Sequence, residues 1–90
     1  MKPQIQYLGK KITIKSLRDY ILENKLREID TILLHPSNFD DIVIEYLDTY
    51  NSSIQLPYFL IGVLIGEDME NSIPKNRVGT VKNDQDPNRR

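Results

Sequence analysis

The stretch from Leu56 to Gly66 is the most apolar part of the chain, with the sequence LPYFLIGVLIG. A continuous apolar run of this length, rich in aromatic and β-branched residues, favours a buried strand. It is too short to cross a bilayer as a helix, which takes about 20 apolar residues. We therefore predict that the segment from Tyr58 to Ile65 is the central strand of a small sheet with both faces covered.

The composition is that of one small globular domain. Hydrophobic residues make up 39% of the 90 residues and charged residues 28%, which is ordinary for a soluble domain. The chain has no cysteine, so disulfides, thiol catalysis and zinc–thiolate sites are excluded. No apolar signal-peptide core follows Met1, and together with the lack of cysteine this leads us to expect a cytoplasmic protein. We assign residues 1–82 to a single α+β domain and residues 83–90 to a disordered polar tail.

Local patterns predict the first elements. Alternating apolar and polar residues around a Gly-Lys turn predict a β-hairpin over residues 4–15. Ser16, with Asp19 three residues later, is a variant of the capping box, so a first helix is expected over about residues 17–25. The apolar run at residues 30–35 predicts a strand that a proline ends.

A second helix is predicted after that proline, with Ser37 as its N-cap. Apolar residues recur there at the spacing of one helix face, namely Phe39, Ile42, Val43, Tyr46, Leu47 and Tyr50. A strand over residues 41–47 is the alternative, because consecutive β-branched residues lower helix propensity. With a last strand over residues 77–82, the order is β-β-α-β-α-β-β. This is an α+β fold with a small mixed sheet of about five strands and two helices.

Two local resemblances to known families follow from these elements. The predicted hairpin, helix and strand over residues 4–35 resemble the start of the β-grasp fold of ubiquitin-like proteins and sulfur carriers. Those proteins end in the Gly-Gly that is conjugated, whereas this chain ends in Pro-Asn-Arg-Arg, so the resemblance implies topology alone. Residues 34–40 (LHPSNFD), followed by GVLI at residues 62–65, are similar to a strand, His-Pro turn and helix in phage capsid proteins. The chain is too short for such a shell subunit, so this resemblance implies an accessory role.

Charge is segregated along the chain, although the formal net charge is −1. Residues 1–29 carry a net charge of +4, residues 30–74 carry −8 without any Lys or Arg, and residues 75–90 carry +3. Segregated charge guides association more than it guides folding. We predict two partner-binding faces: an acidic face of Asp41, Glu45 and Asp48, and a basic face of Lys10, Lys11, Lys15 and Arg18.

Residue types that carry catalysis lack partners in this sequence. His35 is the only histidine; it would be a general base or a metal ligand if functional, but a turn histidine is the favoured interpretation. Carboxylates that could bind Mg²⁺ or Ca²⁺ lack the spacing of a calcium loop, which favours a solvated acidic face: Asp40, Asp41, Glu45, Asp48, Glu67, Asp68 and Glu70. Gly62 and Gly66 lack the lysine of a phosphate-binding loop.

We therefore expect a small non-enzymatic protein–protein interaction or assembly module, with no cofactor and no metal, that binds a protein partner or itself and no membrane. It would serve a larger complex, a phage or another mobile element. The alternative is a nucleic-acid-binding accessory protein that uses the basic N-terminal hairpin and tail. The isoelectric point near 5.7 favours the first of these.

Overall fold

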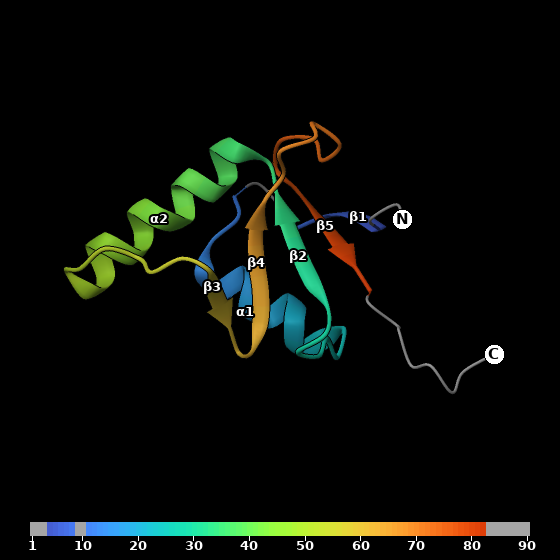
Figure 1. Cartoon of the computed structure of the whole chain (residues 1–90), viewed down its shortest axis with the longest axis horizontal. Coiled ribbons are helices and arrows are strands. Elements are labelled where there is room, and N and C mark those ends of the chain that lie inside the picture. The colour runs from blue at the N-terminus through green and yellow to red at the C-terminus, as the bar shows by residue number, and fades with distance from the viewer. Residues whose placement is uncertain (1–3, 9–10, 83–90) are drawn as a thin grey trace.

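A computed structural model describes residues 4–8 and 11–82 of the chain (Figure 1). Within them the elements are β1 (Gln4–Tyr7), α1 (Ile14–Glu23), β2 (Thr31–Leu34), α2 (Pro36–Tyr50), β3 (Tyr58–Leu60), β4 (Val63–Glu67) and β5 (Arg77–Val81). The described part of the chain therefore has two helices and five strands in one mixed sheet, which confirms the predicted α+β class. The predicted tail at residues 83–90 lies outside the described residues.

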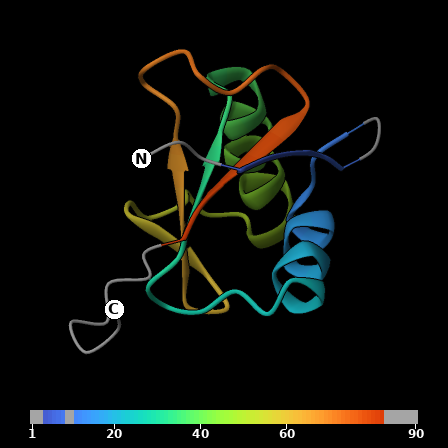
Figure 2. The same ribbon diagram turned by 90° about the vertical axis from the view of Figure 1, so that its right-hand side faces the viewer.

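The strand order of the sheet is β1-β5-β2-β4-β3, so β2 is its central strand. β2 and β4 run parallel, and the other neighbouring pairs are antiparallel. β1 is joined to β2 through α1, and after β2 the chain passes through α2 to the edge strand β3 and then turns back into β4. Figure 2 shows both helices on one side of the sheet.

The core lies between this helix-covered face and the two helices. Alternate strand residues point into it, including Ile32, Leu34, Val63, Ile65 and Val78. They meet buried side chains of the helices, including Leu17, Tyr20, Ile21, Phe39 and Ile42. One polar contact crosses this layer, where the Tyr20 hydroxyl lies 2.7 Å from Thr80 Oγ1.

The opposite face of the sheet is open among the described residues, and the prediction of a sheet covered on both faces is wrong. Leu33 and Leu64 are only half-buried on this face, and Ile5 and Phe59 are exposed. In β2, β3 and β4 the residues on either side of these positions pack in or against the core, as the two-residue period of a strand requires.

The predicted central strand from Tyr58 to Ile65 is also wrong, because the apolar run folds back on itself. β3 pairs with β4 in an antiparallel hairpin, and the two residues between them have positive φ, 49° at Ile61 and 80° at Gly62. Two successive positive φ angles are the signature of a tight hairpin turn whose twist matches that of the strands. Glycine adopts this conformation without strain, so Gly62 marks the turn and not a bulge.

The predicted hairpin over residues 4–15 does not form. β1 pairs with β5 instead, and residues 11–13 belong to no strand. Thr13 is the N-cap of α1: its hydroxyl accepts a hydrogen bond from the Ser16 backbone N–H at 3.0 Å, and Ser16 Oγ accepts one from Thr13 N at 2.8 Å. The helix thus begins three residues earlier than predicted, because Thr13 and not Ser16 is its N-cap. Ile12, just before the cap, is buried in the core. Without the hairpin, the resemblance to the β-grasp topology fails as well.

The prediction of a second helix is confirmed, and the alternative strand over residues 41–47 is excluded. Its N-cap is His35 and not Ser37, with Pro36 at the first helical position, where its missing N–H is not needed. The strands expected at residues 30–35 and 77–82 are confirmed as β2 and β5.

Candidate docking surface

Helix α2 has two apolar faces, and only one of them packs on the sheet. Phe39 and Ile42 are buried in the core. Ile44 and Leu47 point away from Phe39 and Ile42 and remain 56% and 47% exposed. Tyr50 is 59% exposed in the last turn of the helix, where its ring lies 4.6 Å from that of Tyr46. The sequence pattern counted Leu47 with the same helix face as Phe39 and Ile42, but its side chain is half exposed at the border of that face. The i, i+3 spacing of Ile44 and Leu47 was the available signal for this exposed pair, which we call the outer stripe.

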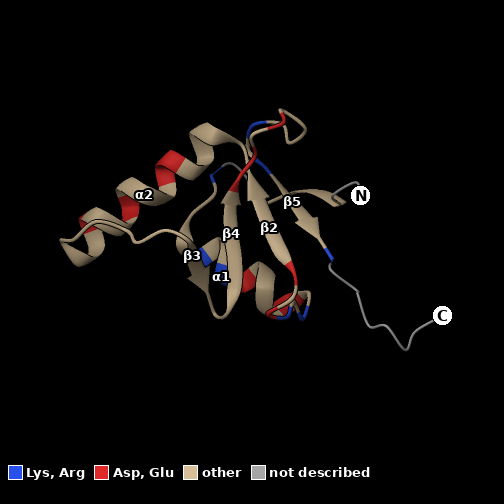
Figure 3. Cartoon of the chain, in the orientation of Figure 1, with Lys and Arg blue, Asp and Glu red and all other residues tan. Residues whose placement is uncertain are grey.

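Carboxylates flank the outer stripe of α2. Asp41 and Asp48 are exposed and lie three residues before and four residues after Ile44, which places them beside it on the helix surface. Figure 3 shows acidic and no basic positions along α2. We call Asp41, Ile44, Leu47 and Asp48 together the α2 face.

Glu45, the third residue of the predicted acidic face, has an internal partner. Its Oε1 accepts a hydrogen bond of 3.0 Å from the backbone N–H of Ile14, the first residue of α1. The first N–H groups of a helix have no intrahelical acceptor, and the helix dipole favours a negative charge there. Glu45 therefore holds the start of α1 against α2, and we remove it from the set of freely available acidic side chains.

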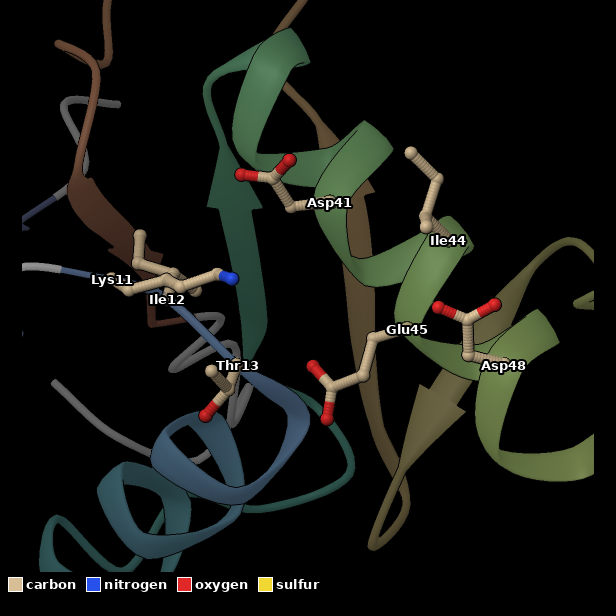
Figure 4. A pocket seen from close by; sticks show the side chains of 7 residues that line it. All are labelled: Lys11, Ile12, Thr13, Asp41, Ile44, Glu45 and Asp48. Carbon is tan, nitrogen blue, oxygen red and sulfur yellow. The ribbon is translucent and has the colours of Figure 1, made fainter.

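A groove of about 240 Å³ separates α2 from the segment that precedes α1 (Figure 4). Lys11, Ile12 and Thr13 line one side, and the other side is lined from α2 by Asp41, Ile44, Glu45 and Asp48. In Figure 4 the Lys11 side chain extends toward α2, and Glu45 points back toward Thr13. The structure thus brings Lys11 and the three predicted acidic residues to the same groove, which three carboxylates and one ammonium group line.

A second groove of about 270 Å³ lies beside the first and shares Glu45 with it. Its α1 side carries Lys15 and Arg18, and its other side carries Tyr50 and Tyr58. Lys15 Nζ forms an exposed ion pair of 3.1 Å with Asp19 Oδ2, one turn further along α1. Among the described residues, no ion pair joins Lys11, Lys15 or Arg18 to a carboxylate of α2. Lys10, the remaining residue of the predicted basic face, lies outside the described residues.

Three tyrosines form a cluster at this second groove. The ring centroids of Tyr46 and Tyr50 are 4.6 Å apart, and those of Tyr46 and Tyr58 are 5.9 Å apart in an edge-to-face arrangement. Partial burial, with smaller contributions from Tyr50, Tyr46 and Glu45, raises the pKa of the Tyr58 hydroxyl above its usual value.

His35 and Ser37 have structural roles at the start of α2. His35 Nδ1 accepts a hydrogen bond of 3.1 Å from the backbone N–H of Ser37 and lies 2.9 Å from the Ser37 hydroxyl. A backbone N–H can only donate, so Nδ1 is occupied as an acceptor and cannot serve as a base without breaking the cap. This arrangement agrees with the interpretation of His35 as a turn residue.

Four other acidic residues lie outside both grooves, namely Asp30, Glu67, Asp68 and Glu70. Asp68 is buried within the loop between β4 and β5, while Glu67 and Glu70 are exposed beside it. Asp30 is fully buried; its Oδ2 accepts from the backbone N–H of Arg27 at 2.9 Å, and its Oδ1 has no hydrogen-bond partner within the described part of the structure. None of the grooves described above includes Asp30.

Among the described residues, no group of three or more His, Cys, Asp or Glu side chains is arranged to hold a metal ion. No helix in the part of the chain that the structure describes is both long enough and apolar enough to span a membrane.

Comparison with known proteins adds nothing to this geometry: no family model matches the chain, and no curated protein or solved structure is significantly similar to it.

Proposed function

We propose that the protein is a small non-enzymatic interaction or assembly module that binds a protein partner through the α2 face. The observation that carries this proposal is the outer stripe of α2. Two large apolar side chains, Ile44 and Leu47, remain about half exposed on this helix, while Phe39 and Ile42 on its other side fill the core. Single exposed apolar residues are common on protein surfaces, but a contiguous group rimmed by charge is typical of an interaction site.

The charge of the rim indicates the chemistry of the partner. Asp41 and Asp48 border the apolar residues, so a matching surface needs apolar side chains flanked by Lys or Arg. Charge of this kind guides encounter and register, whereas burial of Ile44 and Leu47 supplies most of the affinity. An amphipathic helix of a partner protein meets both requirements.

An accessory role for a phage or another mobile element is a separate part of this proposal, and it is supported only by the resemblance to phage capsid proteins. The strand, His-Pro turn and helix on which the resemblance rests are present as the end of β2, His35–Pro36 and the start of α2. This is a local motif, and the proposed docking function does not depend on it.

Site-specific photocrosslinking tests the proposed surface. A photoreactive amino acid replaces Leu47 in the full chain, expressed in the cells from which the protein comes. The matched control carries it at Met69, which is 81% exposed and lies in the loop after β4. We expect cross-linked protein species from position 47 and few from position 69. Equal yields from both positions, or none from position 47, would contradict the proposal.

The second groove supports one other candidate function, the binding of single-stranded nucleic acid. Lys15 and Arg18 face Tyr50 and Tyr58 across it, and proteins bind single strands by combining cationic and stacking side chains. A fluorescent oligonucleotide titrated at several NaCl concentrations tests this candidate. Salt-sensitive binding that Arg18→Ala weakens would support it, and no binding at low salt would remove it.

A further inference from the structure

We infer that the partner of the α2 face is a second copy of this chain, joined in a closed two-fold dimer in which α1 of each copy docks on α2 of the other. This inference rests on the proposed function, because it uses the α2 face as the docking surface. It adds the identity of the partner, the partner's own surface and the symmetry of the assembly.

The exposed sides of the two helices carry complementary charges. Lys15, Arg18 and Leu22 follow one another along α1 at i, i+3 and i+7, and all three are exposed, Leu22 to 60%. Asp41, Ile44 and Asp48 have the same spacing on α2: α1 therefore offers two cations and an apolar residue on one stripe, and α2 offers two carboxylates and an apolar residue on another. We call Lys15, Arg18 and Leu22 the α1 stripe.

The α1 stripe is available to another molecule. Among the described residues, Lys15 is paired only with Asp19, through side chains that are 78% and 47% exposed. Such an exposed pair is weak and easily exchanged. The bond between Glu45 and Ile14 N fixes the start of α1 against α2. In this arrangement the described residues form no ion pair between the α1 stripe and the carboxylates of α2.

The positions of the two charged surfaces are compatible with a two-fold dimer. Both helices lie on the same side of the sheet (Figure 2), and the two charged surfaces flank adjoining grooves that share Glu45. A two-fold axis along these grooves places α1 of one copy on α2 of the other and repeats the contact in reverse. An interface that uses the same surface of both copies closes at two chains, whereas a head-to-tail contact grows into rings or filaments. Pairing α2 of one chain with α2 of the other is disfavoured, because it would bring the carboxylates of Asp41 and Asp48 in one chain close to those in the other.

Charge-swap variants of the full chain, followed by sedimentation equilibrium, test the inference. One variant reverses α2 (Asp41→Lys with Asp48→Lys), and the other reverses the α1 stripe (Lys15→Glu with Arg18→Glu). Wild-type protein is expected to show a monomer–dimer equilibrium that weakens as NaCl rises, because exposed charges are screened beyond about 8 Å at 0.15 M salt. Each variant alone sets like charges together in both contacts and should dimerise at least about tenfold more weakly.

Mixing the two variants is the decisive arm. In a closed dimer, each contact of the mixed pair joins opposite charges, so the equimolar mixture should restore a species of two chains, one of each kind. The matched control, Glu67→Lys with Glu70→Lys, makes the same change of charge on exposed residues outside both grooves and should dimerise like the wild type. Thermal melts followed by circular dichroism establish that every variant is folded.

Several results would overturn the inference. They are a wild-type monomer at all protein and salt concentrations, a mixture that stays monomeric, a mixture that grows beyond two chains, and a control that weakens as much as the α2 variant. The photocrosslinking result shows whether the dimer alone is wrong or the proposed docking function is wrong as well. A cross-link from position 47 to a different protein leaves the docking function intact and removes only the second copy. The lack of any cross-link from that position removes both.

Discussion

At Asp68, three donors from one loop converge on a single carboxylate. The backbone N–H groups of Ile73 and Glu70 donate at 2.7 and 3.1 Å, and the Ser72 hydroxyl donates at 3.2 Å. Burial of Asp68 favours its neutral form, but the hydrogen bonds from Ile73, Glu70 and Ser72 together outweigh burial and hold its pKa below the usual value. The carboxylate thus fixes the path of the chain from β4 toward β5.

This arrangement predicts a pH dependence of stability. Because the pKa of Asp68 is lower in the folded state than in the unfolded chain, its contribution is present above about pH 4 and is lost as the pH falls through the folded-state value. Asp68→Ala should lower the melting temperature at pH 7, and the difference from wild type should shrink in acid. Melts at a series of pH values check this, with exposed Glu70→Ala as the control. A difference that does not change with pH would contradict the account.

Glu45 provides a second residue-scale prediction. Its Oε1 is the acceptor for Ile14 N at 3.0 Å, so Glu45→Ala should destabilise the fold by about 0.5–1.5 kcal/mol, the usual contribution of one hydrogen bond. Glu45→Gln keeps an acceptor oxygen and should lose less. Urea unfolding measures both, and equal stability of the two variants would show that this bond contributes little.

The hydrogen-bonding roles of Asp68 and Glu45 within the fold were not predictable from the sequence. The acidic face was predicted from helical spacing alone, which places Glu45 beside Asp41 and Asp48 but contains no information on where α1 begins. The same limit applies to His35, because its capping role requires the φ and ψ angles of the turn. The structure separates Glu45 from Asp41 and Asp48, because only Glu45 accepts a hydrogen bond from the start of α1.

At the scale of elements, the β3–β4 hairpin shows the gain available from a better turn residue. Ile61 has φ of 49° and is 51% exposed; a β-branched residue in this region is strained by about 1–2 kcal/mol. Asn-Gly is the preferred pair for a turn with two positive φ angles, so Ile61→Asn should raise the free energy of unfolding by about 1 kcal/mol. Ile61→Val is the control, because it keeps the β-branch and should bring no gain. Urea unfolding compares the three proteins, and a loss of stability on Ile61→Asn would show that contacts of Ile61 outweigh its strain.

The same hairpin predicts opposite responses at two neighbouring positions. Val63 is fully buried, whereas Ile61 lies in the exposed turn. Burial of an unpaired carboxylate costs several kcal/mol out of a total stability of about 5–15 kcal/mol, so Val63→Asp should unfold the domain and Ile61→Asp should leave it folded. Circular dichroism melts distinguish these outcomes. Unfolding by both substitutions would instead favour the continuous strand that the sequence suggested.

The elements themselves were predictable where one periodic face decides them. The stripe beginning at Phe39 identified α2, and the apolar runs identified β2 and β5. The run from Tyr58 to Ile65 was misassigned because a buried strand and a tight hairpin of two short strands have the same apolar composition. Only the backbone at Ile61 and Gly62 separates them, and that is a conformational property that apolar periodicity does not contain.

At the scale of the whole molecule, the sheet order decides which parts are most stable. β2 has hydrogen-bonded neighbours on both sides, β5 and β4, whereas β1 and β3 are the edges of the sheet. The sequence could not supply this order, because β5 is last in the chain and inserts between β1 and β2 through long-range pairing. It also could not show that the helices cover one face only, since half-buried residues such as Leu33 and Leu64 are apolar like those of the core.

This order predicts a gradient of hydrogen exchange across the sheet. All four residues of β1 are exposed, and its pairing is to one neighbour, so the strand should open locally without unfolding the core. Amides of β2 that pair with β5 and β4 should exchange only through global unfolding and be the slowest in the sheet. Exchange followed by NMR at neutral pH measures both strands in one experiment. Amides of β1 as slow as those of β2 would mean that the free edge of β1 is covered, and the edge would then have to be counted with the α2 face as a surface engaged in assembly.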